Sequence, residues 1–437
     1  MLATKKIGCS CFTAAAFFFF IIPNLFAQGS ALSTQPTSAQ STQIASSSAQ
    51  TGSIAVPAAS QATAPASQNE EALRAVVSLL SLEEKAAQVL MVNIAGSKTA
   101  DVNSIASFKG TVPGAILLFG YNIADTPQAV ADFLESAVHG FQDTAHRSGH
   151  TFIPPLFALD NEGGTVYRTR RITVPLPAAE EIGIRFSIEE TENLYRLLGQ
   201  QMRELGLHLN LAPVAEAGTK ETATALGTRT YSMEPKQAGQ YAAAAVRGMQ
   251  SAGILAAVKH FPGNGAADLH KGTAELAVDY KTFLNRYCAP FRPSITDGTA
   301  AVVISHITVP AIEAVPFCFS AKGITLLRNE LGFSGLIITD DIVMQALKQN
   351  GASPEENAMR ALTAGCDMIM CSLSKIYPLI EAIAEKARSN AEFAKRLDEA
   401  VLQVLIAKQR AGLIDTDKPV NSGRVKMRVA PTNQNKD

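Results

Sequence analysis

The chain has 437 residues, of which 47% are hydrophobic and 18% charged, so it carries enough apolar material for a large core. Its 38 lysines and arginines nearly balance its 39 aspartates and glutamates, which argues against the basic surface that a nucleic-acid partner requires. The composition therefore favours a globular protein that does not bind nucleic acid.

The first segment, residues 1–27, has the features of a secretory signal peptide. Lysines precede an apolar run, Ala14–Ile22, and Ala27 supplies a small residue at the expected cleavage point. Pro23 interrupts the run well short of the roughly 20 apolar residues that a membrane span needs. We therefore expect signal cleavage, export to the periplasm or the exterior, and no stable membrane span in the mature protein.

The segments on either side of the main body have few large apolar residues. Residues 28–69 consist almost entirely of Ser, Thr, Ala, Gln, Gly and Pro, which predicts a disordered linker. Residues 415–437 predict a flexible tail. The part between them, residues 70–414, has the length of one (β/α)8 barrel.

The cysteines of this body do not show the paired CxxC spacing of a metal site. Because they are widely spread, we expect buried free thiols, although an exported protein would permit disulfides. The four residues concerned are Cys288, Cys318, Cys366 and Cys371. The sequence predicts neither a metal nor a cofactor.

Short apolar runs alternate along the body with longer amphipathic stretches, a pattern typical of parallel strands joined by crossover helices. The sequence predicts eight strands, at Val89–Ile94, Ala115–Phe119, Leu156–Leu159, His208–Leu211, Ala257–His260, Ala301–Ser305, Leu336–Thr339 and Met368–Cys371.

Helix starts lie between these strands. Ser81 with Glu84, and Ser187 with Glu190, have the spacing of capping boxes, and Thr126 and Ser353 each precede a proline suited to the first helical turn. No GxGxxG motif follows the first strand, as many doubly wound sheets would require. The predicted fold class is therefore α/β, a single (β/α)8 barrel, with the doubly wound sheet as the alternative.

Ionisable residues follow several of the predicted strands. A barrel places its reactive residues at the C-terminal ends of its strands, and here those ends carry Asp160, Lys259, His260, His306 and Asp340. A plain structural loop does not require such groups. We therefore expect a site at this end of the barrel, where His306 either lines the pocket or packs behind it.

Asp340 directly follows the apolar strand Leu336–Thr339, so its carboxylate should project into the barrel mouth. Neighbouring lysines and arginines would keep it ionised there. The alternative is a cap on the next helix, a role that suits Asp341 better. Glu162 is interpreted as an acceptor of N–H groups in a tight turn and not as the proton donor.

Asp268 and His270 lie in a loop rich in glycine and proline that follows the fifth predicted strand. A carboxylate two residues before a histidine can orient the imidazole and raise its proton affinity, as a general acid and base requires. The alternative is a solvated loop histidine beside an incidental aspartate.

Six motifs along the body resemble those of glycoside hydrolase family 3, most closely its single-barrel bacterial β-N-acetylglucosaminidases. Lys259–Gly263 (KHFPG) is the most specific match, and Asp160–Gly164 (DNEGG) is similar to the family's DQEGG segment. The others are Leu82–Lys85 with Gln88–Met91, Pro113–Phe119, Gly335–Asp341 and Ala364–Met368.

The resemblance implies a retaining exo-β-N-acetylglucosaminidase that acts on peptidoglycan fragments (muropeptides) or related amino-sugar glycosides. In such an enzyme Asp340 would be the nucleophile, and His270 with Asp268 the acid and base. The residues implied in binding the sugar hydroxyls and the N-acetyl group are Asp160, Arg168, Arg229, Lys259 and His260.

The chain departs from the family pattern at several points, including Leu269 and Ile342–Val343. Asn264 stands where a histidine is usual, Glu216 where an aspartate is common, and the stretch between Gly265 and Asp268 is two residues shorter. Two alternatives stay open: a β-glucosidase or β-xylosidase of the same family, and an inactive exported glycan-binding protein. Transfer to phosphate instead of water, the oligomeric state and the aglycone are not decided by the sequence.

Overall fold

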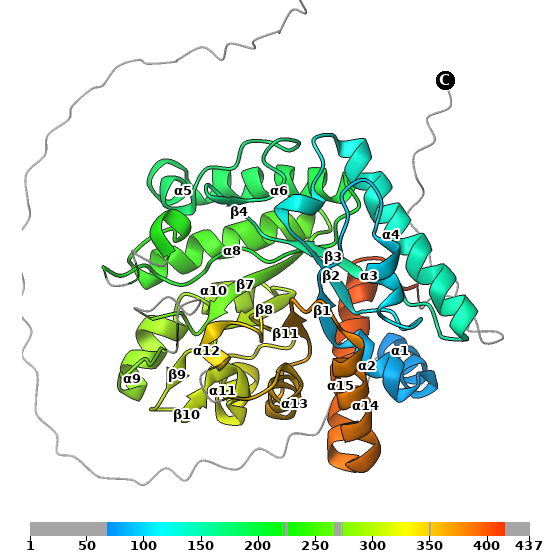
Figure 1. Ribbon diagram of the computed structural model, residues 1–437. Coiled ribbons are helices and arrows are strands. Elements are labelled where there is room, and N and C mark those ends of the chain that lie inside the picture. The colour runs from blue at the N-terminus through cyan, green and yellow to red at the C-terminus, as the bar shows by residue number, and fades with distance from the viewer. Residues whose placement is uncertain are drawn as a thin grey trace, which may run out of the picture. The chain divides into compact units, whose positions relative to one another are not determined.

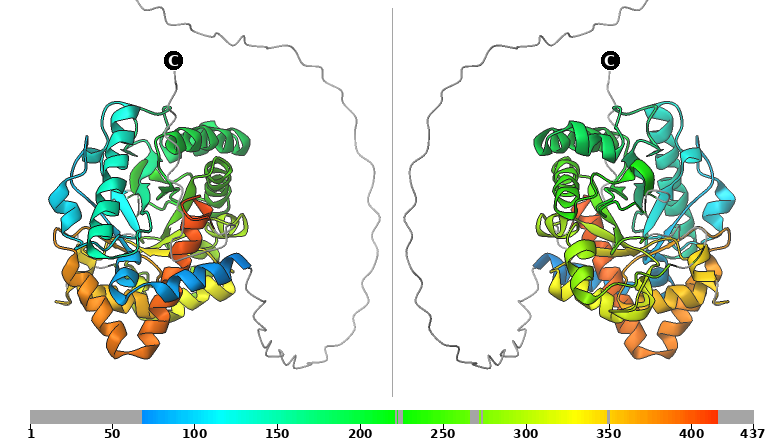
Figure 2. Two further views of the ribbon diagram at one scale, coloured as in Figure 1. Left: turned by 90° about the vertical axis from the view of Figure 1, so that its right-hand side faces the viewer. Right: turned by 90° about the vertical axis from the view of Figure 1, so that its left-hand side faces the viewer.

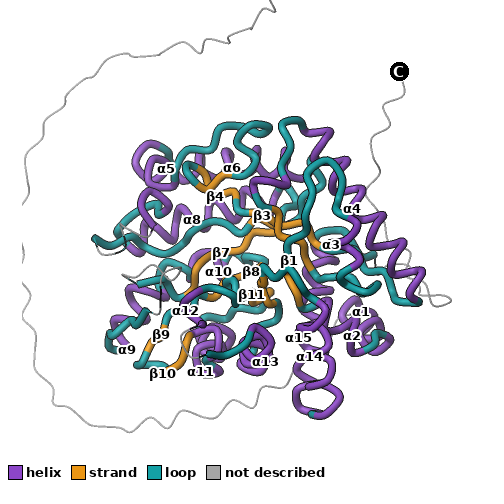
Figure 3. Tube along the Cα trace, in the orientation of Figure 1, coloured by secondary structure: helices purple, strands orange, loops and turns teal. Residues whose placement is uncertain are grey.

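A parallel sheet of eight strands forms the centre of the structure (Figures 1 and 3). The computed structural model describes residues 68–220, 222, 226–265, 272, 274–348 and 351–415. The barrel strands are β1 (Leu90–Val92), β2 (Ala115–Leu118), β3 (Leu156–Leu159), β6 (Leu209–Asn210), β7 (Leu255–Phe261), β8 (Ala301–Ile304), β11 (Leu336–Thr339) and β12 (Ile369–Cys371). Each one overlaps a predicted strand.

The strands follow one another around the sheet in chain order, and the two edge strands come together. The order is β11-β8-β7-β6-β3-β2-β1-β12, with every pairing parallel. Thr339 N–H donates to Met368 O at 3.0 Å, and Ile342 N–H donates to Met370 O at 3.0 Å, so β11 also contacts β12. The sheet is thus nearly closed, which confirms the predicted (β/α)8 barrel and excludes the open-sheet alternative.

Helices surround the strands, as the tube in Figure 3 shows. The α-helices are α1 (Gln68–Leu79), α2 (Leu82–Gln88), α3 (Val102–Ala106), α4 (Pro127–Ser148), α5 (Ala179–Arg185), α6 (Ile188–Glu204), α8 (Pro235–Ser251), α9 (Tyr280–Thr282), α10 (Arg292–Thr296), α11 (Ala321–Thr325), α12 (Gln345–Lys348), α13 (Pro354–Ala364), α14 (Tyr377–Ser389) and α15 (Ala391–Arg410).

Shorter elements occupy the connections at the C-terminal ends of the strands. The hairpins are β4 (Asn161–Gly163) with β5 (Val166–Tyr167), and β9 (Thr308–Val309) with β10 (Glu313–Pro316). The single 3₁₀ turns are η1 (Gly120–Asn122), η2 (Gly227–Arg229) and η4 (Phe317–Phe319). The segments η3 (Phe283–Cys288) and η5 (Leu326–Glu330) are π-helical and directly continue α9 and α11.

The predicted helix starts are confirmed by hydrogen bonds. Ser81 Oγ accepts from Glu84 N–H at 3.2 Å, while Glu84 Oε2 accepts from Ser81 N–H at 2.6 Å. Ser187 and Glu190 form the same reciprocal pair at the start of α6. Thr126 caps α4 in front of a first-turn proline, and Ser353 caps α13 in the same way. These caps satisfy N–H groups that would otherwise lack partners.

Side chains along each strand alternate between two apolar clusters. In β2, Ala115 and Leu117 belong to a cluster inside the barrel, whereas Ile116 and Leu118 belong to the larger cluster between the barrel and its helices. This alternation follows from the two-residue period of a strand. Because both faces are buried, the strand sequences are apolar throughout, which is why they could be recognised.

The end of α15 closes the bottom of the barrel. Val404 and Ala407 on this helix, and Ala411 and Leu413 just after it, pack in the same inner cluster as the strand residues. Helix α1, at the other end of the described body, packs against α15 (Figure 2). Among the described residues, the bottom of the barrel is therefore filled by α15 and the segment after it.

Two further predictions concern the described residues. All four cysteines are buried free thiols, as expected. No helix within the described ranges is long and apolar enough to cross a membrane. Residues 1–27, most of 28–69 and nearly all of 415–437 lie outside these ranges, so the signal, linker and tail boundaries stay predictions.

Candidate active site

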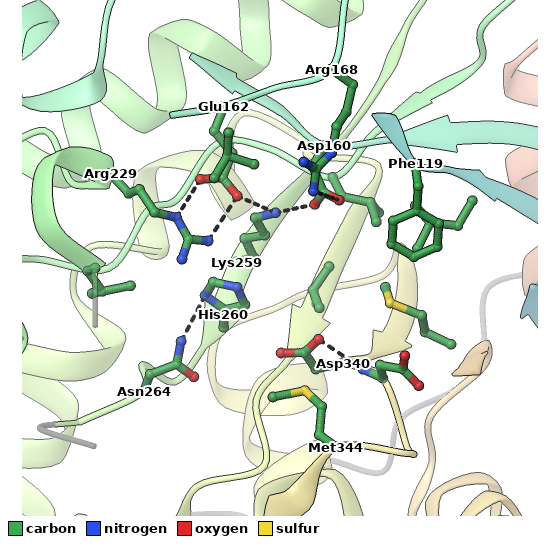
Figure 4. A pocket seen from close by; sticks show the side chains of 17 residues that line it. Phe119, Asp160, Glu162, Arg168, Arg229, Lys259, His260, Asn264, Asp340 and Met344 are labelled. Atoms are coloured by element: carbon green, nitrogen blue, oxygen red, sulfur yellow. Dashed lines mark hydrogen bonds and ion pairs between the residues drawn. The ribbon is translucent and has the colours of Figure 1, made fainter. Parts of the chain in front are cut away.

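A cavity of about 320 Å³ opens at the C-terminal ends of the barrel strands (Figure 4). This volume is at the lower end of the range of ligand pockets. The polar residues that line it are Asp160, Glu162, Arg168, Arg229, Lys259, His260, Asn264, Asp340 and Asp341. Most of them come from segments distant in the sequence, which the barrel brings to one rim.

Lys259 lies at the centre of the upper wall and binds two carboxylates. Its Nζ atom is 2.6 Å from Asp160 Oδ1 and 2.6 Å from Glu162 Oε1. Arg229 holds the other side of Glu162 with two bonds, Nε to Oε2 at 2.7 Å and Nη2 to Oε1 at 2.9 Å. Such a forked pair fixes the plane of both groups. The wall therefore offers pre-oriented charged groups to hydroxyls of a ligand.

Glu162 is ionised in this wall. Burial by itself would raise the pKa of its carboxyl, but Lys259 and Arg229 outweigh burial and lower that pKa from 4.5 to about 2. Glu162 accepts N–H groups, as predicted, but the donors are the side chains of Arg229 and Lys259 and not groups of a tight turn. Its role is to hold Lys259 and Arg229 in place.

We expect Glu162→Gln to lower the free energy of unfolding near pH 7, and the difference from wild type to shrink in acid. The stabilisation from a carboxylate with a lowered pKa is fully present above pH 4.5 and is lost as the pH falls through about 2. The difference at pH 3 should be smaller than at pH 7 by roughly 1–2 kcal/mol. Urea titrations at both pH values measure it.

The exposed Glu181, which pairs with Arg185 one turn later on α5, provides a matched control. Glu181→Gln should change stability by less than about 1 kcal/mol at either pH. A Glu162→Gln deficit that is the same size at pH 3 and pH 7 would contradict the ionised carboxylate described above.

Arg168 extends the upper wall towards the solvent. Its Nη2 atom is 3.9 Å from Asp160 Oδ2, and its side chain is 31% exposed. The Nε atom is buried and has no hydrogen-bond partner among the described residues. Asp160 thus lies between Lys259 and Arg168, and Arg168 keeps donor capacity for a ligand.

His260 faces the cavity from the end of β7 and is held from behind by Glu216. The imidazole Nδ1 is 2.7 Å from Glu216 Oε1, and the backbone N–H of Asn264 donates to Glu216 Oε2 at 2.8 Å. A carboxylate only accepts, so His260 carries its proton on Nδ1 in this bond. The second ring nitrogen is then left for the cavity.

Asp340 lies at the floor of the cavity, directly after β11. Its backbone N–H donates to Ile304 O at 2.9 Å, and its Oδ1 accepts from Asp341 N–H at 2.9 Å. Desolvation opposes ionisation of Asp340, but His260, His306 and the Asp341 N–H together more than offset it and lower the pKa of this carboxyl. Asp340 is therefore an ionised carboxylate with one oxygen fixed by the backbone.

The neighbouring Asp341 was expected to cap the next helix, but α12 begins only at Gln345 and Asp341 binds loop N–H groups before it and after β12 instead. Its Oδ1 accepts from Val343 N–H at 3.1 Å and from Ser372 N–H at 3.3 Å. These bonds turn its carboxylate towards the loops after β11 and β12. Of the two consecutive aspartates, Asp340 is thus the one available for chemistry.

The remaining wall of the cavity is apolar. In Figure 4, Phe119 lies across the cavity from Arg229 and His260, and Met344 lies beside Asp340. Leu117, Val303 and Met370 complete this wall. A sugar ring has polar edges and apolar C–H faces, so a cavity divided in this way can orient a single ring.

The cavity brings together most of the residues predicted for the site. Those that line it are Asp160, Arg168, Arg229, Lys259, His260 and Asp340, and their individual roles stay predictions. Asp268 and His270 lie outside the described residues, so the structure does not place the predicted acid and base.

Two contributions to the site were not expected from sequence. Glu216 supports His260, and Asn264 lines the cavity beside it. Both positions stand out in the sequence as departures from the family pattern, but a pattern does not show that the two residues contact each other. Among the residues that the structure describes, no cluster of His, Cys, Asp or Glu could hold a metal ion.

Comparisons with known proteins identify the relatives of this chain. The family model described as glycosyl hydrolase family 3 N terminal domain matches residues 81–407. A beta-hexosaminidase of Nitrosomonas eutropha is 31% identical over 290 residues, which are 64% of this chain and 79% of that protein.

Two solved structures are also similar. The family 3 β-N-acetylglucosaminidase of Paenibacillus sp. FPU-7 has a TM-score of 0.68 at 28% identity, covering 80% of this chain and 66% of its own. The β-N-acetylhexosaminidase of Beutenbergia cavernae has a TM-score of 0.67 at 28% identity, covering 76% of this chain and 99% of its own.

Proposed function

The chain belongs to glycosyl hydrolase family 3, and from this membership we propose that it is a retaining exo-β-N-acetylglucosaminidase with Asp340 as its nucleophile. Its substrates are glycosides that end in N-acetylglucosamine, such as peptidoglycan fragments. The observation that carries the proposal is the ionised Asp340 carboxylate at the floor of a cavity whose opposite wall holds Asp160, Lys259 and Arg168.

Placing C1 of the sugar against Asp340 determines where the other parts of the ring lie. Asp160 and Lys259, at the opposite wall, then meet hydroxyls remote from C1, and the apolar wall around Phe119 contacts C–H groups. The ring edge that carries the acetamido group faces Arg229, His260 and Asn264. This arrangement uses donors and acceptors that the ion pairs already hold in position.

The reaction proceeds in two displacements. A carboxylate oxygen of Asp340 forms a bond to C1 while the bond from C1 to the aglycone oxygen breaks, and His270 supplies the proton that this oxygen needs. Water then attacks C1, gives its proton to His270 and releases Asp340. Two inversions leave the product with the β configuration of the substrate. The assignment of His270 and Asp268 relies on the family resemblance.

The size of the cavity supports exo action on one terminal sugar. At about 320 Å³ it suits a single ring rather than a run of sugars. The chain also has no tryptophan, and its aromatic content of 6% supplies little for the stacking platforms of an extended cleft. We propose that the enzyme is exported and acts in the periplasm or outside the cell.

A substrate panel tests the function. Hydrolysis of 4-nitrophenyl N-acetyl-β-glucosaminide should exceed hydrolysis of the β-glucoside and the β-xyloside, and proton NMR should show the β-anomer of N-acetylglucosamine as the first product. A preference for glucoside or xyloside would identify the alternative activity, and sugar binding without turnover would identify a glycan-binding protein. Glycosyl phosphate formed in phosphate buffer would reveal phosphorolysis.

A further inference from the structure

His306 has no part in the function proposed above, although it lies next to the nucleophile. It follows β8 and Ser305, and it is buried, with 1% of its surface exposed. Its Nε2 atom is 3.0 Å from the carbonyl oxygen of Asp341, and its Nδ1 atom is 3.2 Å from Cys318 Sγ. Both ring nitrogens therefore have partners, one of them in the peptide that follows Asp340.

The two partners determine the protonation of the ring. A carbonyl oxygen can only accept, so Nε2 of His306 carries the hydrogen and donates to Asp341. Burial lowers the pKa of His306 and raises the pKa of the Cys318 thiol, so both groups are uncharged near neutral pH. Nδ1 is then the acceptor, and the Cys318 S–H donates to it.

Cys318 is itself held in place. It lies in η4, is fully buried, and its carbonyl oxygen accepts from the thiol of Cys366 at 3.5 Å. These groups form one chain of hydrogen bonds, from the Cys366 thiol to the Cys318 backbone, from the Cys318 thiol to His306, and from His306 to Asp341. The chain passes from the shell of helices to the floor of the cavity.

The end of this chain matters because the Asp340–Asp341 segment orients the nucleophile. The N–H of Asp341 donates to Asp340 Oδ1, while the carbonyl of the same residue accepts from His306. The same carbonyl also accepts from Met344 N–H at 3.1 Å, and Ile342 N–H of the same peptide donates to Met370 O at 3.0 Å. The bond from His306 is therefore one of three that hold this peptide, and it is the one made by a side chain. Its loss removes part of the support that keeps the Asp341 N–H directed at the nucleophilic carboxylate.

From this geometry we propose that His306, oriented by the thiol of Cys318, is a positioning residue that fixes the carboxylate of Asp340 for attack on C1. The inference builds on the proposed function, because it assumes that Asp340 is the nucleophile. A misplacement of a reacting group by about 1 Å costs roughly 10²-fold in rate, which sets the scale of the expected effect.

Two variants separate the hydrogen bond from simple packing. His306→Leu keeps the apolar bulk and removes the donor, whereas the amide of His306→Gln can still donate to Asp341 O. The substrate is 2,4-dinitrophenyl N-acetyl-β-glucosaminide, whose leaving group departs without protonation, so kcat/KM reports the attack by Asp340 alone. We expect His306→Leu to lose roughly 10²-fold in kcat/KM, and His306→Gln to recover at least about tenfold of that loss.

The inhibition constant of N-acetylglucosamine separates a positioning role from a general structural defect, because a general defect would also weaken binding of the sugar. N-acetylglucosamine should inhibit wild type and both variants with the same inhibition constant, because His306 does not line the cavity. Two variants of Cys318 should show smaller effects. Cys318→Ala should lose roughly tenfold in kcat/KM, and Cys318→Ser, which keeps a donor, should stay closer to wild type.

His208 offers a matched control at the opposite end of the barrel. It is a half-buried histidine whose Nδ1 accepts from Phe157 N–H at 3.1 Å, and burial lowers its pKa to about 4. His208→Leu should destabilise the fold without changing kcat/KM. If His306→Leu does not fold, the kcat/KM values of Cys318→Ala and Cys318→Ser provide the test.

The outcomes that overturn the inference differ from those that overturn the function. An active wild type with a His306→Leu variant of equal kcat/KM contradicts the positioning role alone. Equal losses in the Leu and Gln variants, together with weaker inhibition by N-acetylglucosamine, would mean that His306 only supports the fold. A wild type that turns over no glycoside contradicts the proposed function, and the inference fails with it.

Discussion

Replacing Asp340 with alanine should lower kcat by roughly 10⁴-fold or more, because the covalent step loses its nucleophile while the rest of the cavity is unchanged. The variant also creates space beside C1. Sodium azide should therefore restore part of the turnover of a dinitrophenyl glycoside, and the product should be the α-glycosyl azide. Steady-state kinetics with and without azide, and NMR of the product, measure both effects.

Asp101 provides the matched control for this change. It caps helix α3, where its Oδ1 accepts from Ser104 N–H at 2.7 Å, and it does not line the cavity. Asp101→Ala should lose about 1 kcal/mol of stability as a cap and keep its kcat. An Asp340→Ala variant with wild-type kcat, or an azide product of β configuration, would contradict the proposed mechanism.

Replacing Lys259 with methionine should cost both stability and activity. The substitution leaves Asp160 and Glu162 without the cation that lies 2.6 Å from each. Removing one member of a buried ionic cluster costs about 3–5 kcal/mol, because the remaining charges stay desolvated. We also expect kcat/KM to fall by at least about 10²-fold, because the upper wall that holds the sugar loses its shape. Urea unfolding and the nitrophenyl assay measure the two losses.

Lys85 is the appropriate comparison. Its Nζ is 2.8 Å from Asp398, its own side chain is 11% exposed, and its partner is 46% exposed. Lys85→Met should cost about 1 kcal/mol or less and leave kcat/KM unchanged. If Lys259→Met were as stable and as active as Lys85→Met, the ion cluster would not be the element that organises the cavity.

The barrel could be predicted from sequence because strands buried on both faces are continuous apolar runs. The strand Leu336–Thr339 has the same limits in prediction and structure. The fourth strand is shorter than predicted, only Leu209–Asn210. At its end the side chain of Asn210 pairs with the backbone of Asn161 at 2.9 and 3.0 Å. The pattern of apolar and polar residues along a sequence does not reveal a contact of this kind between a side chain and a distant backbone.

The site residues that directly follow a predicted strand could be identified from sequence. The pairs of interacting side chains that are distant in the chain could be identified less well. Asp160, Lys259 and Asp340 follow from their positions at the ends of apolar runs. The partnership of Glu162 with Arg229 joins residues 67 apart, and that of Glu216 with His260 joins residues 44 apart. Such pairs exist only after the barrel has formed. From sequence, His306 could either line the pocket or pack behind it. Its contacts with Cys318 and Asp341 show that it lies behind the cavity floor.

The contribution of α15 to the inner cluster has a consequence for how the chain acquires its structure. Val404, Ala407, Ala411 and Leu413 complete a core whose other members begin at Met91. During synthesis from the N-terminus, the barrel therefore lacks its base until almost the whole body has left the ribosome. A nascent chain of this protein should remain incompletely folded, and open to chaperones, until its last helix emerges.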